Sequence, residues 1–170
     1  IRQGYRMTND TPPAARYLDA LSLPYRLFRH TQPIRSLEQA AAERGQSPQQ
    51  VVRSIVFRLN ECEYVMVLAA GPGQLPWQAL RKFFGTTRMS MADPQTVLEL
   101  TGYATGTVNP FVASAVPGQP LPLPVVVEVG VLEQRELSIG SGVRDLAIIL
   151  PLSSLLAGLG EYRSAHLFAS

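Results

Sequence analysis

Alternation of apolar and polar positions predicts strands along much of the chain. Residues 51–59 alternate between two faces, residues 64–70 are almost continuously apolar, and the polar run 60–63 between them predicts a hairpin turn. The apolar runs 125–129 and 146–150 are typical of buried strands. Shorter strands are expected at 25–30, 87–91 and 136–139.

Helix-start residues predict helices in the segments between these strands. Three starts carry capping residues: Thr11-Pro12, Ser36-Leu37-Glu38-Gln39 and Asp93-Pro94. Further helices are expected over 76–84 and from Pro151 onward, with one helical turn at 47–50. Strands and helices alternate irregularly, which indicates an α+β fold with a mixed sheet.

Composition narrows the class of protein. The chain has 170 residues, of which 46% are hydrophobic and 16% charged, and its formal net charge is +2. This balance supplies one core and argues against disorder or a coiled coil, so we expect a flexible N-terminal lead-in over 1–10 and a single domain over 11–170. No apolar run reaches the roughly 18 residues that span a bilayer, and one cysteine cannot form an internal disulfide. A cytoplasmic protein without a membrane partner is therefore expected.

Several common catalytic and cofactor sites lack their defining residues. The turn Gly71-Pro72-Gly73 has proline where a dinucleotide loop needs its third glycine, and Gly140-Ser141-Gly142 lacks the flanking glycines of a nucleophile elbow. Cys62 lies between two glutamates, which disfavour its thiolate. Two histidines and one cysteine, far apart in sequence, offer little for zinc. We therefore expect neither a cofactor nor a metal.

Arg53 stands out within the predicted strand 51–59. Side chains alternate along a strand, so Arg53 shares a face with Ile55 and Phe57. A guanidinium there must be paired, open onto a cleft, or extend to water from the strand end. The pattern alone leaves the functional and the purely structural interpretation open.

The segment 101–110 carries two glycines four residues apart and a closing proline. Glycine allows positive φ and close approach of a ligand, so such a loop can aim main-chain amides at an oxyanion or a phosphate. A plain connector is the alternative interpretation. His30 ends a predicted strand, where a structurally hydrogen-bonded histidine is favoured over a catalytic one.

Taken in order, these residues resemble the YbaK/ProX family of aminoacyl-tRNA editing domains. The similarity runs from about Ala14 to Leu156. It is carried by these segments: Val51-Val52-Arg53-Ser54-Ile55-Val56, Gly73-Gln74-Leu75, Met91-Ala92-Asp93-Pro94, Thr101-Gly102-Tyr103 and the stretch from Gly106 to Pro110, with His30 and Pro33 as a looser match. The resemblance implies flanking helices around a mixed, largely antiparallel sheet curled into a partly open barrel. It implies trans-acting hydrolysis of the ester that joins a wrong, small amino acid to the tRNA 3′ end, with no metal and no side-chain nucleophile.

The resemblance also implies site residues and partners. The catalytic set would be Arg53, Gly106, Thr107, Val108, Asn109 and Pro110, with the tRNA ribose hydroxyl assisting water. The substrate-binding set would be His30, Gly102, Tyr103, Ser141 and Gly142. The partners would be the acceptor end of an aminoacyl-tRNA and an aminoacyl-tRNA synthetase.

Two departures from the family pattern bear on activity. Arg53 stands where the family usually has lysine, and Ala147 stands where it often has an acidic residue. Arginine keeps the charge but is larger and planar. Two alternatives to hydrolysis therefore stay open: a non-catalytic module that binds aminoacyl-tRNA or a small ligand, and a fold reused for protein contacts.

Overall fold

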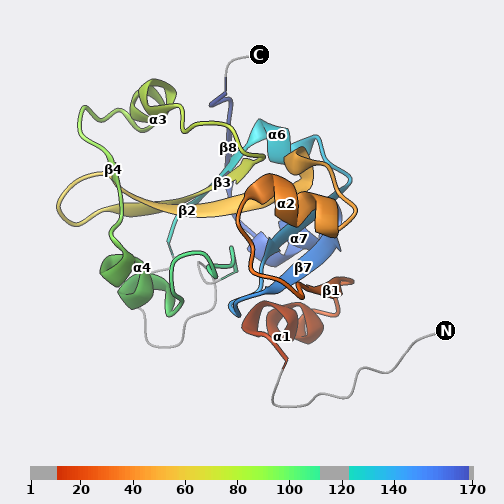
Figure 1. Cartoon of the computed structure of the whole chain (residues 1–170). Helices are drawn as coiled ribbons and strands as arrows, with labels where there is room; N and C mark the ends of the chain where they lie inside the picture. Colours follow the sequence, from red (N-terminus) through yellow and green to blue (C-terminus); the bar gives the residue numbers. More distant parts are fainter. Residues whose placement is uncertain (1–10, 112–122, 169–170) are drawn as a thin grey trace.

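The chain forms two β-sheets with helices packed around them (Figure 1). The computed structural model describes residues 11–111 and 123–168, so the predicted lead-in over 1–10 lies outside the described residues. The helices are α1 (Pro13–Ala20), α2 (Leu37–Glu43), α3 (Trp77–Phe84), α4 (Pro94–Thr101), α6 (Val129–Leu132) and α7 (Leu152–Leu159), with a 3₁₀ turn η1 (Pro48–Gln50). The strands are β1 (Arg26–Arg29), β2 (Val52–Arg58), β3 (Tyr64–Ala70), β4 (Ser90–Met91), β5 (Val125–Glu128), β6 (Glu136–Gly140), β7 (Leu146–Pro151) and β8 (Arg163–Ala165).

The two sheets differ in size and pairing. The larger sheet has the order β4-β2-β3-β5-β8, with antiparallel pairing on one side of β3 and parallel pairing on the other. The smaller sheet, β1-β7-β6, is antiparallel throughout. An isolated parallel bridge between Val51 and Ser138 joins the sheets, which do not close into a barrel. The predicted α+β class with mixed, largely antiparallel pairing is confirmed.

Local signals set most element boundaries. The hairpin of β2 and β3 pairs Arg58 with Tyr64 across the predicted turn. The Ser36 hydroxyl accepts from the Gln39 amide at 3.0 Å to cap α2, and the Asp93 carboxylate accepts from the Thr96 amide at 2.9 Å to cap α4. The first helix begins one residue later than predicted, because Pro12 occupies its N-cap.

The two faces of β2 pack into two different hydrophobic clusters. Val52 and Val56 lie in the cluster that includes residues of the smaller sheet, whereas Ile55 and Phe57 lie in the cluster with α3. Period-two alternation therefore sends the side chains of neighbouring β2 residues to opposite sides of the larger sheet. No helix among the described residues is long and apolar enough to cross a membrane.

Candidate functional site

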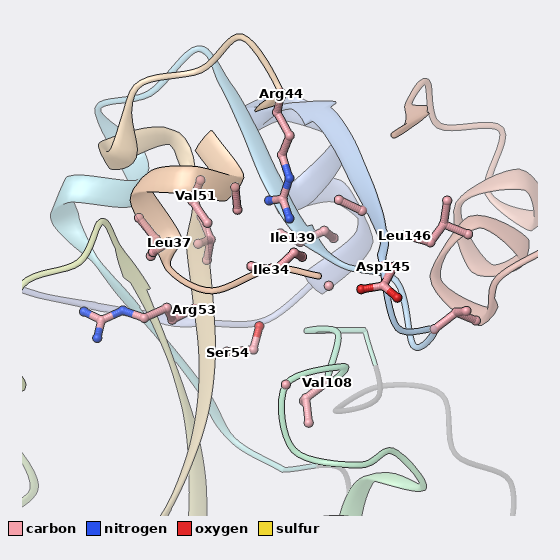
Figure 2. Close-up of a pocket in the computed structure, with 16 residues that line it drawn as sticks. Ile34, Leu37, Arg44, Val51, Arg53, Ser54, Val108, Ile139, Asp145 and Leu146 are labelled. Carbon is pink, nitrogen blue, oxygen red and sulfur yellow. The ribbon is translucent and has the colours of Figure 1, made fainter. Parts of the chain in front are cut away.

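A cavity of about 310 Å³ lies beside the bridge between the two sheets (Figure 2). Its apolar walls include Leu37 from the first turn of α2, Val52 from β2 and Ile139 from β6. Four of its lining residues carry charged or polar side chains: Arg44, Arg53, Ser54 and Asp145. The volume falls at the lower end of the range of small-molecule sites.

The segment 106–110 borders this cavity and is held against the turn between β6 and β7. The Thr107 carbonyl accepts a hydrogen bond from the Gly142 amide at 2.9 Å. The buried Asn109 side chain accepts from the Phe111 amide at 3.0 Å and so folds the end of the loop back on itself. The loop path is therefore fixed by contacts at both of its ends.

Two residues of this loop, Gly106 and Val108, line the cavity. Gly106 has a φ of +90°, a left-handed conformation that favours glycine. Within residues 11–111 and 123–168, the amides of Gly106 and Val108 donate to no other protein group. Main-chain amides free to donate beside a cavity can stabilise negative charge that develops on a carbonyl oxygen.

Arg53 lines the same cavity, but its guanidinium is directed elsewhere. Figure 2 shows this group turned away from Val108 and Ile139. Its Nη2 donates to the Gly73 carbonyl at 2.7 Å, while its Nε is buried without a partner among the described residues. Burial lowers the pKa of Arg53 from its ordinary value. The structure thus places Arg53 and the 106–110 loop on one cavity, with the arginine charge at the edge of the cavity.

Ser54 was missed by sequence reasoning. It occupies the opposite face of β2 from Arg53 and lines the cavity, and its Oγ is buried without a hydrogen-bond partner in the described part of the chain. Figure 2 shows the hydroxyl on the side of Val108. Its sequence signal was a hydroxyl between Val52 and Val56 on one face of the strand.

His30 lies behind the cavity wall rather than in it. The side chain is buried, its Nδ1 hydrogen-bonds the Glu43 carboxylate, and its Nε2 accepts from Arg44 Nε at 3.0 Å. Since Nε2 accepts, the ring carries its proton on Nδ1 in this arrangement. The bond to His30 is the largest cause of the lowered pKa of Glu43.

Arg44 and Asp145 are two further cavity residues that sequence reasoning did not identify. Arg44 also donates from Nη1 to Ser138 Oγ at 2.8 Å, and burial lowers its pKa. Asp145 adopts a φ of +63°, which is uncommon outside glycine. No local motif marks either residue, because tertiary contacts bring them to the cavity.

The other predicted binding residues support the site from outside the cavity. Gly102 ends α4 in a left-handed conformation, with a φ of +78°. Tyr103 packs against Gly142, where a β-carbon would lie 2.8 Å from its ring. The Ser141 hydroxyl is fully buried and donates to the Leu146 carbonyl at 2.6 Å. These contacts stabilise the turn on which the 106–110 loop rests.

Comparison with known proteins gives this cavity a context. Residues 31–157 match the model of the aminoacyl-tRNA editing domain. A proline–tRNA ligase of Thermosipho melanesiensis is 32% identical over 81 residues, which are 48% of this chain and 14% of the ligase. The uncharacterized protein YwhH of Bacillus subtilis is 34% identical over 76 residues, which are 45% of this chain and 48% of that protein.

The chain therefore spans less than half the length of these curated relatives. A solved structure assigned as a candidate trans-editing enzyme for prolyl-tRNA synthetase is 25% identical, with a TM-score of 0.74 over 93% of this chain and 98% of that one. The family match covers the residues that line the cavity, the 106–110 loop and all strands of the two sheets except β1 and β8. The chain belongs to the aminoacyl-tRNA editing domain family.

Proposed function

We propose that this chain hydrolyses the ester between a small, wrongly attached amino acid and the 3′-terminal ribose of a tRNA. The observation that carries the proposal is a pair of amides, Gly106 and Val108, that bond to none of the described residues and belong to the wall of a cavity of about 310 Å³. An aminoacyl group enters this cavity, and its ester carbonyl lies against the two amides. The family match supports editing chemistry, and the similarity to a candidate trans-editing enzyme supports action on a tRNA charged elsewhere.

The reaction needs positioning and charge stabilisation more than a strong nucleophile. Water attacks the carbonyl carbon, and the carbonyl oxygen gains negative charge that the Gly106 and Val108 amides stabilise. The bond between the carbonyl carbon and the ribose oxygen then breaks. The proton of the attacking water passes, by way of the neighbouring ribose hydroxyl, to that oxygen. The products are a free amino acid and an uncharged tRNA.

Arg53 serves in this proposal as an anchor for the tRNA end. Its guanidinium sits at the cavity edge and is held by the Gly73 carbonyl. The Nε atom is buried, but Nη1 and the second hydrogen of Nη2 remain available to a phosphate, which the planar group can grip through two parallel bonds. The side chain therefore fixes the terminal nucleotide rather than the ester carbonyl.

One observation favours a second function. Because the Arg53 guanidinium is bound to Gly73 and turned from the cavity, the site lacks a cation at that face of the acyl group. A domain that binds aminoacyl-tRNA without hydrolysing it is the candidate that this geometry supports.

Deacylation assays separate the two functions. The wild-type protein is mixed with tRNAs that carry alanine, cysteine, serine or threonine, and loss of the ester is followed over time. Hydrolysis of at least one charged tRNA well above the spontaneous rate is expected. Binding in a gel shift without any hydrolysis supports the binding module. A protein that neither binds nor hydrolyses any of these charged tRNAs would overturn both functions.

A matched pair of variants tests the role of Arg53. Arg53→Met removes a charge-assisted contact worth about 1.5–3 kcal/mol, so kcat/KM should fall roughly 10- to 150-fold. Arg58→Met is the control, because Arg58 lies on the same strand and also donates to main-chain carbonyls, those of Asn60 and Glu61. Equal deacylation activity of the two variants would show that Arg53 does not take part in binding the tRNA end.

A further inference from the structure

Two opposite charges, Arg44 and Asp145, line the cavity, and the proposed hydrolysis makes no use of either. They come from different elements, since Arg44 follows α2 and Asp145 precedes β7. Between described residues the ion pair of charged side chains is Arg26 with Glu136, and the neutral His30 ring stands between Arg44 and the Glu43 carboxylate. Arg44 and Asp145 therefore have no opposite charge at contact distance among the described residues, and Glu43 acts on Arg44 only through space. Two opposite charges on the walls of one small cavity, neither in contact with an opposite charge among the described residues, match a ligand that carries both signs.

The Arg44 guanidinium is held in a fixed position and keeps N–H groups that no described residue accepts. A guanidinium has five N–H donors, and the described contacts use one to His30 Nε2 and one to Ser138 Oγ. Ser138 is fully buried, so the guanidinium is fixed against the smaller sheet. Figure 2 shows the group extending from the end of α2 toward Ile139. The remaining donors match the two oxygens of a carboxylate.

Asp145 is held in place through its main chain. Its carbonyl accepts from the His30 amide at 2.8 Å, and its φ of +63° sets the direction of the side chain. The carboxylate makes no hydrogen bond to any described residue and lines the cavity with Arg44. An unpaired carboxylate in this position matches an ammonium group.

His30 connects the two charges. Its ring accepts from the Arg44 side chain, and its amide donates to the Asp145 main chain. One buried residue therefore contacts both the Arg44 side chain and the Asp145 main chain.

We propose that the cavity binds a free α-amino acid, with its carboxylate on Arg44 and its α-ammonium on Asp145. The proposal rests on the proposed function, because the same cavity takes the aminoacyl group. The ester presents only its ammonium, to Asp145; hydrolysis creates the carboxylate that Arg44 then binds. The cavity volume of about 310 Å³ has room for a free amino acid with a small side chain. The released amino acid should therefore act as a product inhibitor of deacylation.

Binding of small molecules to the isolated protein tests this without tRNA. L-alanine, L-serine, L-threonine and L-cysteine are each titrated by calorimetry and by NMR shift mapping. The best of them is then compared with its methyl ester and its N-acetyl derivative. We expect each derivative to bind at least about tenfold more weakly, because each lacks one of the two charges.

Variants assign each charge to its residue. Arg44→Gln should abolish the preference for the acid over the methyl ester, and Asp145→Asn should abolish the preference for the amine over the N-acetyl derivative. Arg58→Met should change neither. Amide NMR spectra check that each variant is folded, and Arg44→Met, which also removes the charge, replaces Arg44→Gln if the latter unfolds. Arg44→Lys, which retains the charge, should keep a preference for the acid.

The outcomes separate this proposal from the function on which it rests. Amino acids that do not bind, derivatives that bind as well as the parent, or preferences that survive both variants overturn the two-charge site even if the protein deacylates tRNA. Charge-dependent binding without deacylation supports the site and counts against hydrolysis alone.

Discussion

Gly140 approaches the main chain of Val108 so closely that a β-carbon at position 140 would lie 2.5 Å from the Val108 carbonyl oxygen. The Thr107 carbonyl would lie 3.3 Å away on the same side. Because both neighbours are main chain, no side-chain rotation can relieve the contact. The end of β6 thus acts as the support that sets the position of the cavity loop.

Gly140→Ala should displace this loop. Overpacking of this kind costs about 1–3 kcal/mol of unfolding free energy, and deacylation by the folded fraction should fall because the Gly106 and Val108 amides move. Denaturant unfolding and single-turnover deacylation measure the two effects. Gly85→Ala is the control: it lies in open space with a φ of +63°, so it should lose stability while activity per folded molecule is kept. Normal activity in Gly140→Ala would contradict the role of the contact.

Ser54→Ala should separate stability from function. The Ser54 hydroxyl is buried and has no partner among the described residues, so its removal should leave the free energy of unfolding unchanged or raise it by up to about 1 kcal/mol. Substrate affinity should fall if the hydroxyl meets the acyl group. Ser138→Ala provides the contrast, since it removes the acceptor of Arg44 and should cost about 1–3 kcal/mol. A clear loss of stability in Ser54→Ala would show that the hydroxyl is already satisfied.

Acid should weaken the Glu43–His30 contact. The bond to His30, assisted by one from Gln39, holds the pKa of Glu43 below its ordinary value of 4.5. Because the pKa of Glu43 is lower in the folded state, the stability that the Glu43–His30 contact contributes is complete above about pH 4.5. That stability is lost as the pH falls through the lowered pKa. Glu43→Gln should therefore flatten the acid limb of stability against pH, measured by urea unfolding between neutral pH and about pH 3. An unchanged acid limb would show that other carboxylates produce it.

Phe111 anchors the far end of the cavity loop in the core. It is 1% exposed, stacks on Tyr17 at 4.9 Å between ring centroids, and would contact a β-carbon at Gly158 at 2.6 Å. Phe111→Ala should cost about 3–5 kcal/mol, measured by denaturant unfolding. Phe83→Ala, at a half-buried position on α3, should cost distinctly less. Similar losses would mean that the loop end does not depend on this packing.

Most of the fold could be predicted because its signals are local. Alternation and a polar turn define the hairpin of β2 and β3, and Asp93 with Pro94 defines the start of α4. Two elements gave no signal: α6 is a single turn, and β8 is only three residues long and mostly exposed. Elements this short depend on tertiary contacts rather than on propensity.

The cavity was only partly predictable for a similar reason. Arg53 and the 106–110 loop were identified from motifs, and they line one cavity. The direction of the Arg53 guanidinium depends on the Gly73 carbonyl, which lies 20 residues away. Arg44 and Asp145 are connected by hydrogen bonds to His30, and no periodicity in the sequence predicts these long-range bonds.

The bridge between Val51 and Ser138 places the cavity at the junction of the two sheets. Each sheet contributes a wall to the cavity, and that bridge is the point at which the described strands of one sheet pair with those of the other. A small change in the angle between the sheets alters the width of the space between them while the hydrogen bonds within each sheet are kept. Acyl-group selectivity in such a domain can thus be tuned by residues remote from the substrate, wherever they tilt one wall against the other.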